Sequence, residues 1–246
     1  MRIEVLDDAE DVAQRGAQEI AAAARDAVAA RGRFAWAVSG GRTPWRMLAW
    51  LAETREVPWR RMDVFQVDER VAPEGDPARN WIQLEDALLS FAPLPPGHAH
   101  AMAVGECRDD ADLATAAAAY ARALEAACGA PPVLDLAHLG LGADGHTASL
   151  VPGDPVLDVA DRDVAFTAEP YQGHRRMTLT FPALARARRV LWVVTGAEKR
   201  DALARLLAGD AAIPAARVRA ADALVLADRA AAGTRVFSSS GAAPAP

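Results

Sequence analysis

The chain has 246 residues, a formal net charge of −6 and a sequence pI near 5.4. This length is enough to bury a substantial core in one α/β domain, and the negative charge argues against nucleic acid and anionic membrane surfaces as partners, because both are polyanions. The two cysteines, Cys107 and Cys128, lie far apart and favour neither a disulfide framework nor a thiolate metal site, so we expect both to be reduced.

The N-terminal residues carry no recognisable targeting segment. Residues 1–8 contain no basic region followed by an apolar core, and no apolar run in the sequence reaches the length of a membrane span. We therefore expect a cytoplasmic protein that does not insert into a membrane.

Short apolar runs alternate with helical patterns along the chain. The predicted strands are residues 3–6, 34–38, 62–67, 100–104, 133–139, 164–167, 176–180, 190–195 and 223–226. The predicted helices are about residues 8–31, 44–53, 79–91, 109–128 and 199–208, with a short helix after Pro182. Asp7 or Asp8 can cap the first helix, and Thr43 is the predicted N-cap of the second, with Pro44 as its first residue.

The alternation of strands and helices predicts an α/β fold. Near-continuous apolar strands indicate a mostly parallel, Rossmann-like sheet covered by helices on both faces. No composition break divides the chain, so we expect one domain over residues 1–237, and the small, polar, proline-bearing tail 238–246 is predicted to be disordered. Open α/β sheets bind ligands at the carboxyl ends of their strands, so polar residues that follow strands are the candidate site.

The most polar strand end is the loop 139–152, which follows the predicted strand 133–139. Its Asp144 stands two residues before His146, and an aspartate can hold one imidazole tautomer while the other ring nitrogen faces a substrate, as a general base requires. The alternative is a structural loop histidine. Glycines from Gly140 to Gly145 formally match a dinucleotide fingerprint, but no helix opens directly from them, so this pattern is weak.

A second glycine turn, residues 39–44, joins the predicted strand 34–38 to a helix. A strand, a glycine turn and a helix start expose backbone N–H groups and the positive end of the helix dipole, which together bind phosphate. The alternative is an ordinary strand-to-helix connection, which often contains glycine.

Four cationic residues lie next to predicted loops and complete the candidate set: Arg42, Arg70, Arg176 and Lys199. Single basic residues are usually solvated, but all four lie where a ligand would bind. Ser39 and Ser149 stand outside a nucleophile elbow, which makes a covalent serine hydrolase unlikely. His98 and His100 form a pair without a nearby third ligand, so we expect no metal site there.

Five ordered motifs resemble those of the 6-phosphogluconolactonases, within the glucosamine-6-phosphate isomerase/6-phosphogluconolactonase family. They are Ser39-Gly40-Gly41-x-Thr43-Pro44, Asp68-Glu69-Arg70, Gly140-x-Gly142-x-Asp144-Gly145-His146-Thr147-x-Ser149-Leu150-x-Pro152, Arg176-x-Thr178-Leu179-Thr180 and Thr195-Gly196-x-x-Lys199. The resemblance runs from Ser39 to the segment 228–232, and its two glycine loops occur in the expected order.

The resemblance implies a single α/β domain related to glucosamine-6-phosphate deaminase, without cofactor or metal. It also implies hydrolysis of the small-molecule substrate 6-phospho-D-glucono-1,5-lactone in the oxidative pentose phosphate pathway, by a monomer or homodimer. His146 would activate water and Asp144 would position it. The other implied site residues bind substrate or phosphate, or neutralise the developing oxyanion: Ser39, Gly40, Gly41, Arg42, Thr43, Asp68, Arg70, Gly145, Arg176 and Lys199.

The sequence departs from the family pattern at a few positions. Arg42 stands where a small serine is frequent, Trp81 where tyrosine is expected and Val151 where phenylalanine is frequent. The final motif lacks a tryptophan before Asp228, so the C-terminal match is the loosest.

Two other functions remain open on the sequence. A related amino-sugar phosphate deaminase would resemble Asp-Gly-His followed by Asn-Glu-Pro, whereas residues 150–152 read Leu-Val-Pro, and it would carry tyrosine in place of Arg70. A sugar-phosphate sensor without catalysis is the second alternative; the acidic chain shows no DNA-binding module, and the presence of His146 favours catalysis.

Overall fold

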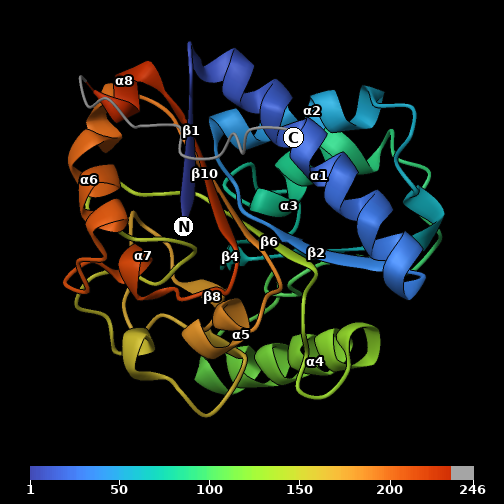
Figure 1. The fold of residues 1–246 in the computed structure, drawn as a ribbon. Helices are drawn as coiled ribbons and strands as arrows, with labels where there is room; N and C mark the ends of the chain where they lie inside the picture. The colour runs from blue at the N-terminus through green and yellow to red at the C-terminus, as the bar shows by residue number, and fades with distance from the viewer. Residues whose placement is uncertain (234–246) are drawn as a thin grey trace, which may run out of the picture.

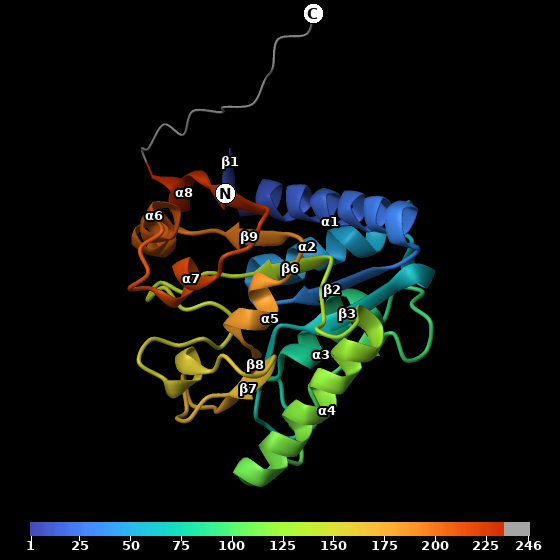
Figure 2. The ribbon, with the colours of Figure 1, turned by 60° about the horizontal axis from the view of Figure 1, so that its bottom comes forward.

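The computed structural model describes residues 1–233. They form a seven-stranded parallel sheet, which lies between two layers of helices, together with a smaller antiparallel sheet (Figures 1 and 2). The strands of the large sheet are, in spatial order, β1 (Arg2–Leu6), β10 (Ala223–Asp228), β9 (Val190–Val194), β6 (Leu136–Leu139), β2 (Phe34–Val38), β3 (Met62–Gln66) and β5 (Ala99–His100). Four of the five inner strands, β10, β9, β6 and β2, are buried at every residue, which explains their continuous apolar runs.

Alternate side chains of each strand enter separate cores on the two faces of the sheet. In β2, Phe34 and Trp36 enter one core while Ala35 and Ala37 enter the other. The first core is covered by the helical elements α1 (Ala9–Arg31), α2 (Arg42–Glu53), η1 (Trp59–Arg61), α3 (Asn80–Leu84) and its π-helical continuation η2 (Glu85–Leu89). The second is covered by α4 (Asp110–Cys128), α5 (Phe181–Ala185), α6 (Arg200–Ala208) and α7 (Pro214–Arg217). In Figure 2, α1 and α2 lie above the sheet and α4 below it.

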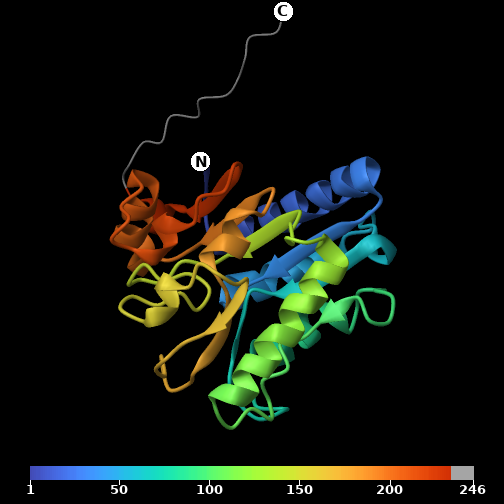
Figure 3. The same cartoon turned by 90° about the horizontal axis from the view of Figure 1, so that it is seen from below.

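The small sheet has the strand order β4 (Asp68–Arg70), β8 (Arg176–Leu179) and β7 (Val164–Phe166). Only Val67 separates β4 from β3, so the chain passes from the large sheet straight into the small one. Figure 3 shows the β7–β8 hairpin, in gold, projecting beside α4. The antiparallel register places Arg70 opposite Arg176.

Short elements complete the chain and lie near strand ends. They are η3 (Pro155–Asp158), η4 (Ala197–Lys199) and α8 (Arg229–Ala232). Among residues 1–233, no helix combines the length and the apolar character needed to cross a bilayer.

The predicted mostly parallel α/β architecture is confirmed, and two details of the prediction are wrong. Thr43 does not cap α2, because Gly41 is the N-cap and Thr43 is already helical. The predicted strand 100–104 is only Ala99–His100, since the backbone N–H of Met102 donates to the side chain of Gln66. Residues 176–180 pair in the small antiparallel sheet. The predicted tail, 238–246, and the last four residues of the predicted domain lie outside the described residues.

Tyr120 anchors α4 to the end of β3. Its hydroxyl donates to the carbonyl oxygen of Gln66 at 2.8 Å and accepts from the N–H of the same residue at 2.6 Å. The Tyr120→Phe variant should lose about 1–3 kcal/mol of unfolding free energy, because two buried backbone groups lose their partner. Urea denaturation measures this loss, and a difference below about 0.5 kcal/mol would contradict the anchoring role.

Candidate active site

A cleft of about 610 Å³ opens at the carboxyl ends of β2, β6, β9 and β10, beside the small sheet. Ten predicted residues line it: Ser39, Gly40, Gly41, Arg42, Thr43, Asp68, Arg70, His146, Arg176 and Lys199. Two others, Asp144 and Gly145, lie in the loop that holds His146 and do not line the cleft themselves. Segments far apart in the sequence therefore line one cleft at the carboxyl ends of the strands, where open α/β sheets bind their ligands.

The histidine of the cleft is paired with a carboxylate. Nδ1 of His146 lies 2.6 Å from Oδ1 of Asp144, which also accepts the backbone N–H of His146 at 3.1 Å. Hydrogen bonding to His146 is the largest cause that holds the pKa of Asp144 well below its usual range. Because Nδ1 faces an ionised carboxylate, the proton belongs on Nδ1, and Nε2 keeps its lone pair.

Glycine at position 142 makes this pairing possible. A Cβ on Gly142 would overlap both Nδ1 of His146 and Oδ1 of Asp144. The backbone of the loop closes around the pair, since Gly142 N–H donates to the carbonyl oxygen of His146 at 2.8 Å. The glycines that resemble a nucleotide fingerprint in the sequence thus serve to bring the carboxylate and the imidazole together.

Tyr171 contacts both members of the Asp144–His146 pair, and no sequence motif indicated it. Its hydroxyl donates to Oδ2 of Asp144 at 2.9 Å and lies 3.3 Å from Nδ1 of His146. Tyr171 sits 27 residues from Asp144 in the hairpin between β7 and β8, in a segment without a catalytic pattern. Only the placement of that hairpin over the loop identifies it.

The turn 39–43 also lines the cleft, at the start of the 12-residue helix α2. Gly41 has φ +127°, a conformation that residues with a side chain rarely adopt. The Thr43 hydroxyl meets that of Thr195 at 2.7 Å, which ties the helix start to the end of β9. The Ser39 hydroxyl is buried and has no hydrogen-bond partner among the described residues.

His138 of β6 holds the Ser39 turn through a hydrogen bond to its side chain. Its imidazole Nδ1 accepts the backbone N–H of Ser39 at 3.3 Å, and burial lowers the pKa of His138 to about 3, so the ring is neutral. His138 is completely buried.

Two arginines face the cleft from adjacent strands of the small sheet. Arg176 is only 4% exposed and donates to the carbonyl oxygen of Tyr171 and to the side chain of Gln172. Arg70 donates to the carbonyl oxygen of Ala78 at 2.6 Å. Burial lowers the pKa of Arg176, and Arg70 contributes in the same direction. Like charges placed opposite each other in a sheet are unfavourable, so the pair creates a site for an anion.

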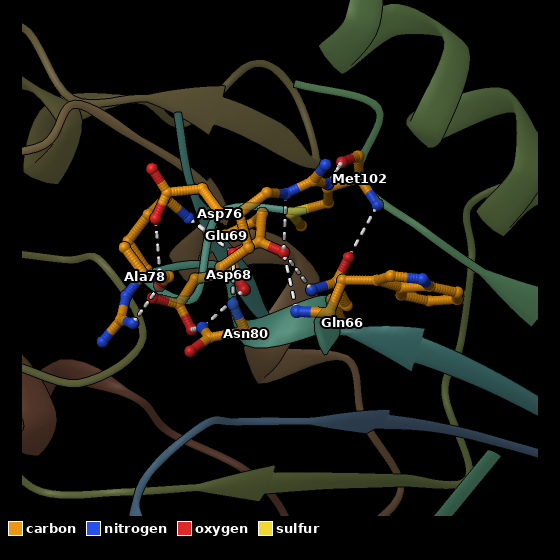
Figure 4. A network of polar contacts seen from close by, with 10 residues as sticks. Gln66, Asp68, Glu69, Asp76, Ala78, Asn80 and Met102 are labelled. Atoms are coloured by element: carbon orange, nitrogen blue, oxygen red, sulfur yellow. Dashed lines mark hydrogen bonds and ion pairs between the residues drawn. The ribbon is translucent and has the colours of Figure 1, made fainter. Parts of the chain in front are cut away.

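A buried glutamate fixes the strand that carries Arg70 (Figure 4). Glu69 is fully buried and accepts the backbone N–H groups of Arg70, Asn80 and Trp81 at 2.7–2.9 Å, and the side-chain amide of Gln66 at 2.8 Å. These hydrogen bonds join β4 to the start of α3. Its role is structural, since it does not line the cleft.

Asp68, one residue before Glu69, does line the cleft. Its Oδ2 accepts the hydroxyl of Ser149 at 2.6 Å, and its backbone oxygen accepts the side chain of Asn80 at 3.1 Å. Ser149 is therefore engaged as a hydrogen-bond donor, in agreement with the expectation that it is not a nucleophile.

Several lining residues were not among the predicted site residues: Asn80, Gln172, Thr195, Glu198 and Asp228. Asp228 had a readable signal, because it ends the last strand. Its carboxylate accepts the N–H groups of Gly196 and Ala231, which holds the turn that leads to Lys199. Asn80 lacked such a signal, since it follows an irregular loop.

His98 and His100 do not line the cleft. His98 and His100 both approach the Asp63 carboxylate, at 3.3 and 2.9 Å. Within residues 1–233, no group of three or more histidine, cysteine, aspartate or glutamate side chains is arranged to hold a metal ion.

The chain is similar to known sugar-phosphate enzymes over most of its length. A family model described as glucosamine-6-phosphate isomerases/6-phosphogluconolactonase matches residues 7–226. A 6-phosphogluconolactonase of Streptomyces coelicolor is 38% identical over 223 residues, which cover 86% of this chain and 85% of that protein. A 6-phosphogluconolactonase of Mycobacterium tuberculosis is 37% identical, with 87% and 90% coverage.

Solved structures show the same likeness. The crystal structure of a 6-phosphogluconolactonase from Thermotoga maritima superposes with a TM-score of 0.82 at 29% identity and covers 92% of this chain and 99% of its own. A monomeric glucosamine-6-phosphate deaminase superposes with a TM-score of 0.80 at 19% identity, covering 96% of this chain and 100% of its own, so it shares the fold.

Proposed function

The chain belongs to the glucosamine-6-phosphate isomerase/6-phosphogluconolactonase family, and on this basis we propose that it hydrolyses 6-phospho-D-glucono-1,5-lactone to 6-phospho-D-gluconate with His146 as the general base. It is a lactone hydrolase of the oxidative pentose phosphate pathway. The observation that carries the mechanism is the Asp144–His146 pair, whose histidine lines the same cleft as the start of α2.

His146 activates the water. Nε2 removes a proton from water as its oxygen attacks the lactone carbonyl, and Asp144 stabilises the imidazolium that forms. The tetrahedral intermediate collapses when the ring C–O bond breaks, and the imidazolium returns the proton to the leaving ring oxygen. A lactone is an activated ester, so no covalent enzyme intermediate is needed.

The cleft binds the two charged parts of the reacting lactone through different elements. The start of α2 offers the Ser39 hydroxyl, the N–H groups of the glycine turn and the side chain of Arg42 to the phosphate, and η4 adds the side chain of Lys199. Arg70 and Arg176 neutralise phosphate or the developing oxyanion from the small sheet. Asp68 accepts hydrogen bonds from substrate hydroxyl groups.

The related deaminase reaction is the second candidate, because that enzyme shares the fold. The position where its loop would carry a glutamate holds Val151, which is 8% exposed and follows the fully buried Leu150. An apolar, buried side chain there cannot assist the histidine in opening a sugar ring. A sensor without catalysis would have no use for the ionised Asp144 beside His146.

An assay on both substrates tests the proposal. The lactone is generated in situ, and its loss is compared with spontaneous hydrolysis, with and without a chelator; deamination of glucosamine 6-phosphate is measured in parallel. We expect accelerated lactone loss, no chelator effect and no deamination. A rate equal to the spontaneous one would refute the function.

Arg70→Ala should weaken binding that depends on the substrate phosphate. We expect KM for the phosphorylated lactone to rise about tenfold, as loss of a charge-assisted contact implies, while the slow turnover of unphosphorylated gluconolactone changes little. Arg60→Ala, at the opposite end of β3, is the matched control. Unchanged selectivity between the two lactones would refute this role of Arg70.

The monomeric or homodimeric state and the cytoplasmic location stay predictions from the sequence. Size-exclusion chromatography with light scattering and fractionation of cells test them separately.

A further inference from the structure

Tyr171 occupies the turn of the β7–β8 hairpin, next to a residue in an unusual conformation. Its backbone forms an isolated antiparallel bridge with His174, and Gln172 has φ +52°, in the left-handed region. Gln172 lines the cleft. Side-chain residues adopt this conformation only where the surroundings impose it, and such positions concentrate at functional sites.

Tyr171 contacts both charged parts of the reaction centre. On one side its hydroxyl donates to Oδ2 of Asp144, and its ring meets that of His146 edge-on, with centroids 5.2 Å apart. On the other side the Arg176 guanidinium lies over the Tyr171 ring, 5.1 Å from its centroid, and donates to the Tyr171 carbonyl oxygen. One residue therefore links the histidine pair to the buried arginine.

The two carboxylate oxygens of Asp144 have different partners. Oδ1 faces His146, and Oδ2 accepts from Tyr171. The Asp144 side chain is 41% exposed, so without the second contact it could rotate about its side-chain bonds and exchange His146 for water. Burial, and then the neighbouring Asp144 carboxylate, raise the pKa of Tyr171, so the hydroxyl stays protonated and acts as a donor.

We propose that Tyr171 is a positioning residue of the hydrolysis: its hydroxyl orients Asp144, and through it His146, while its ring and carbonyl oxygen orient Arg176. This inference rests on the proposed function. Tyr171 transfers no proton to the substrate, and its effect passes through Asp144 and Arg176.

The hydroxyl can be tested without disturbing the ring. Tyr171→Phe should lower kcat about tenfold and leave KM within about twofold, since one hydrogen bond to a charged group is lost away from the substrate. In an Asp144→Ala background the same substitution should change kcat by less than about twofold, because the group through which it acts is gone. A hydroxyl with a merely structural role would give the same reduction in both backgrounds.

The ring has its own test. Tyr171→Leu should lower kcat at least as far as Tyr171→Phe and, unlike it, raise KM, because Arg176 loses the surface on which it rests. Phe181→Leu is the matched control, since it removes another ring under an arginine, Arg217, away from the cleft. It should leave KM unchanged.

The outcomes separate this inference from the proposed function. If the wild type accelerates lactone hydrolysis and Tyr171→Phe matches it in kcat, the positioning role is wrong and the function stands. Equal reductions by Tyr171→Phe with and without Asp144 would also overturn the role. A wild type without lactonase activity refutes the function itself, and the positioning role with it.

Discussion

Replacing His146 with alanine should reduce kcat about 1000-fold, which is within the range expected for loss of a general base. KM should change little, because the cationic residues of the cleft still bind the phosphate of the substrate. The catalysis that remains should come from electrostatic stabilisation of the transition state alone. Initial rates with the freshly generated lactone, corrected for spontaneous hydrolysis, measure the effect.

A histidine outside the cleft is the control for this experiment. His98→Gln alters a half-exposed imidazole beside Asp63, away from the lining residues, and should keep the wild-type kcat. Circular dichroism should show that the His146 variant is folded. Retention of more than about a third of the wild-type kcat would refute general-base catalysis by His146.

The second large effect is expected for Asp144→Asn, with kcat reduced about 100- to 1000-fold and a nearly unchanged KM. An asparagine keeps the shape of the side chain, but its amide can donate to Nδ1 of His146 and so move the ring proton to Nε2. The ring would then present a donor where the reaction needs a base. Asp161→Asn, an exposed carboxylate paired with Arg162, is the control.

The pH dependence of stability provides an independent check on Asp144. Because hydrogen bonding to His146 holds the pKa of Asp144 below its usual value, its ionised form stabilises the fold above the unfolded-state pKa of about 4, and this contribution disappears as the pH falls through the folded-state pKa. The difference in unfolding free energy between wild type and Asp144→Asn should therefore narrow below about pH 4. A difference that grows on acidification would contradict the ionised pair.

Local signals in the sequence predicted the main elements well. Asp8 caps α1 with its side chain and Gly32 ends it in a left-handed conformation, as the caps in the sequence indicate. Gly129 likewise follows α4. These features depend on neighbouring residues alone, and the hydrogen bonds that satisfy helix ends are formed within a few positions.

Predictions failed where a distant part of the chain satisfies the backbone. Thr43 is a good N-cap by residue type, yet its hydroxyl is paired with that of Thr195 and the helix begins two residues earlier, after Gly41. Met102 lies in a segment with a strand-like sequence, but its backbone N–H donates to the side chain of Gln66. In both cases the competing partner lies more than thirty positions away.

The sequence by itself determined the parallel α/β architecture, the two glycine loops and most of the cleft, because strand periodicity and the rule that ligands lie at carboxyl ends of strands need no knowledge of pairing. Only the tertiary structure decided that Arg70 stands opposite Arg176 and that Tyr171 holds Asp144. Those contacts depend on the register of the β7–β8 hairpin and on how it folds over the loop that carries Asp144, 27 positions before Tyr171. The side-chain interactions that select this arrangement join residues that no local sequence pattern relates.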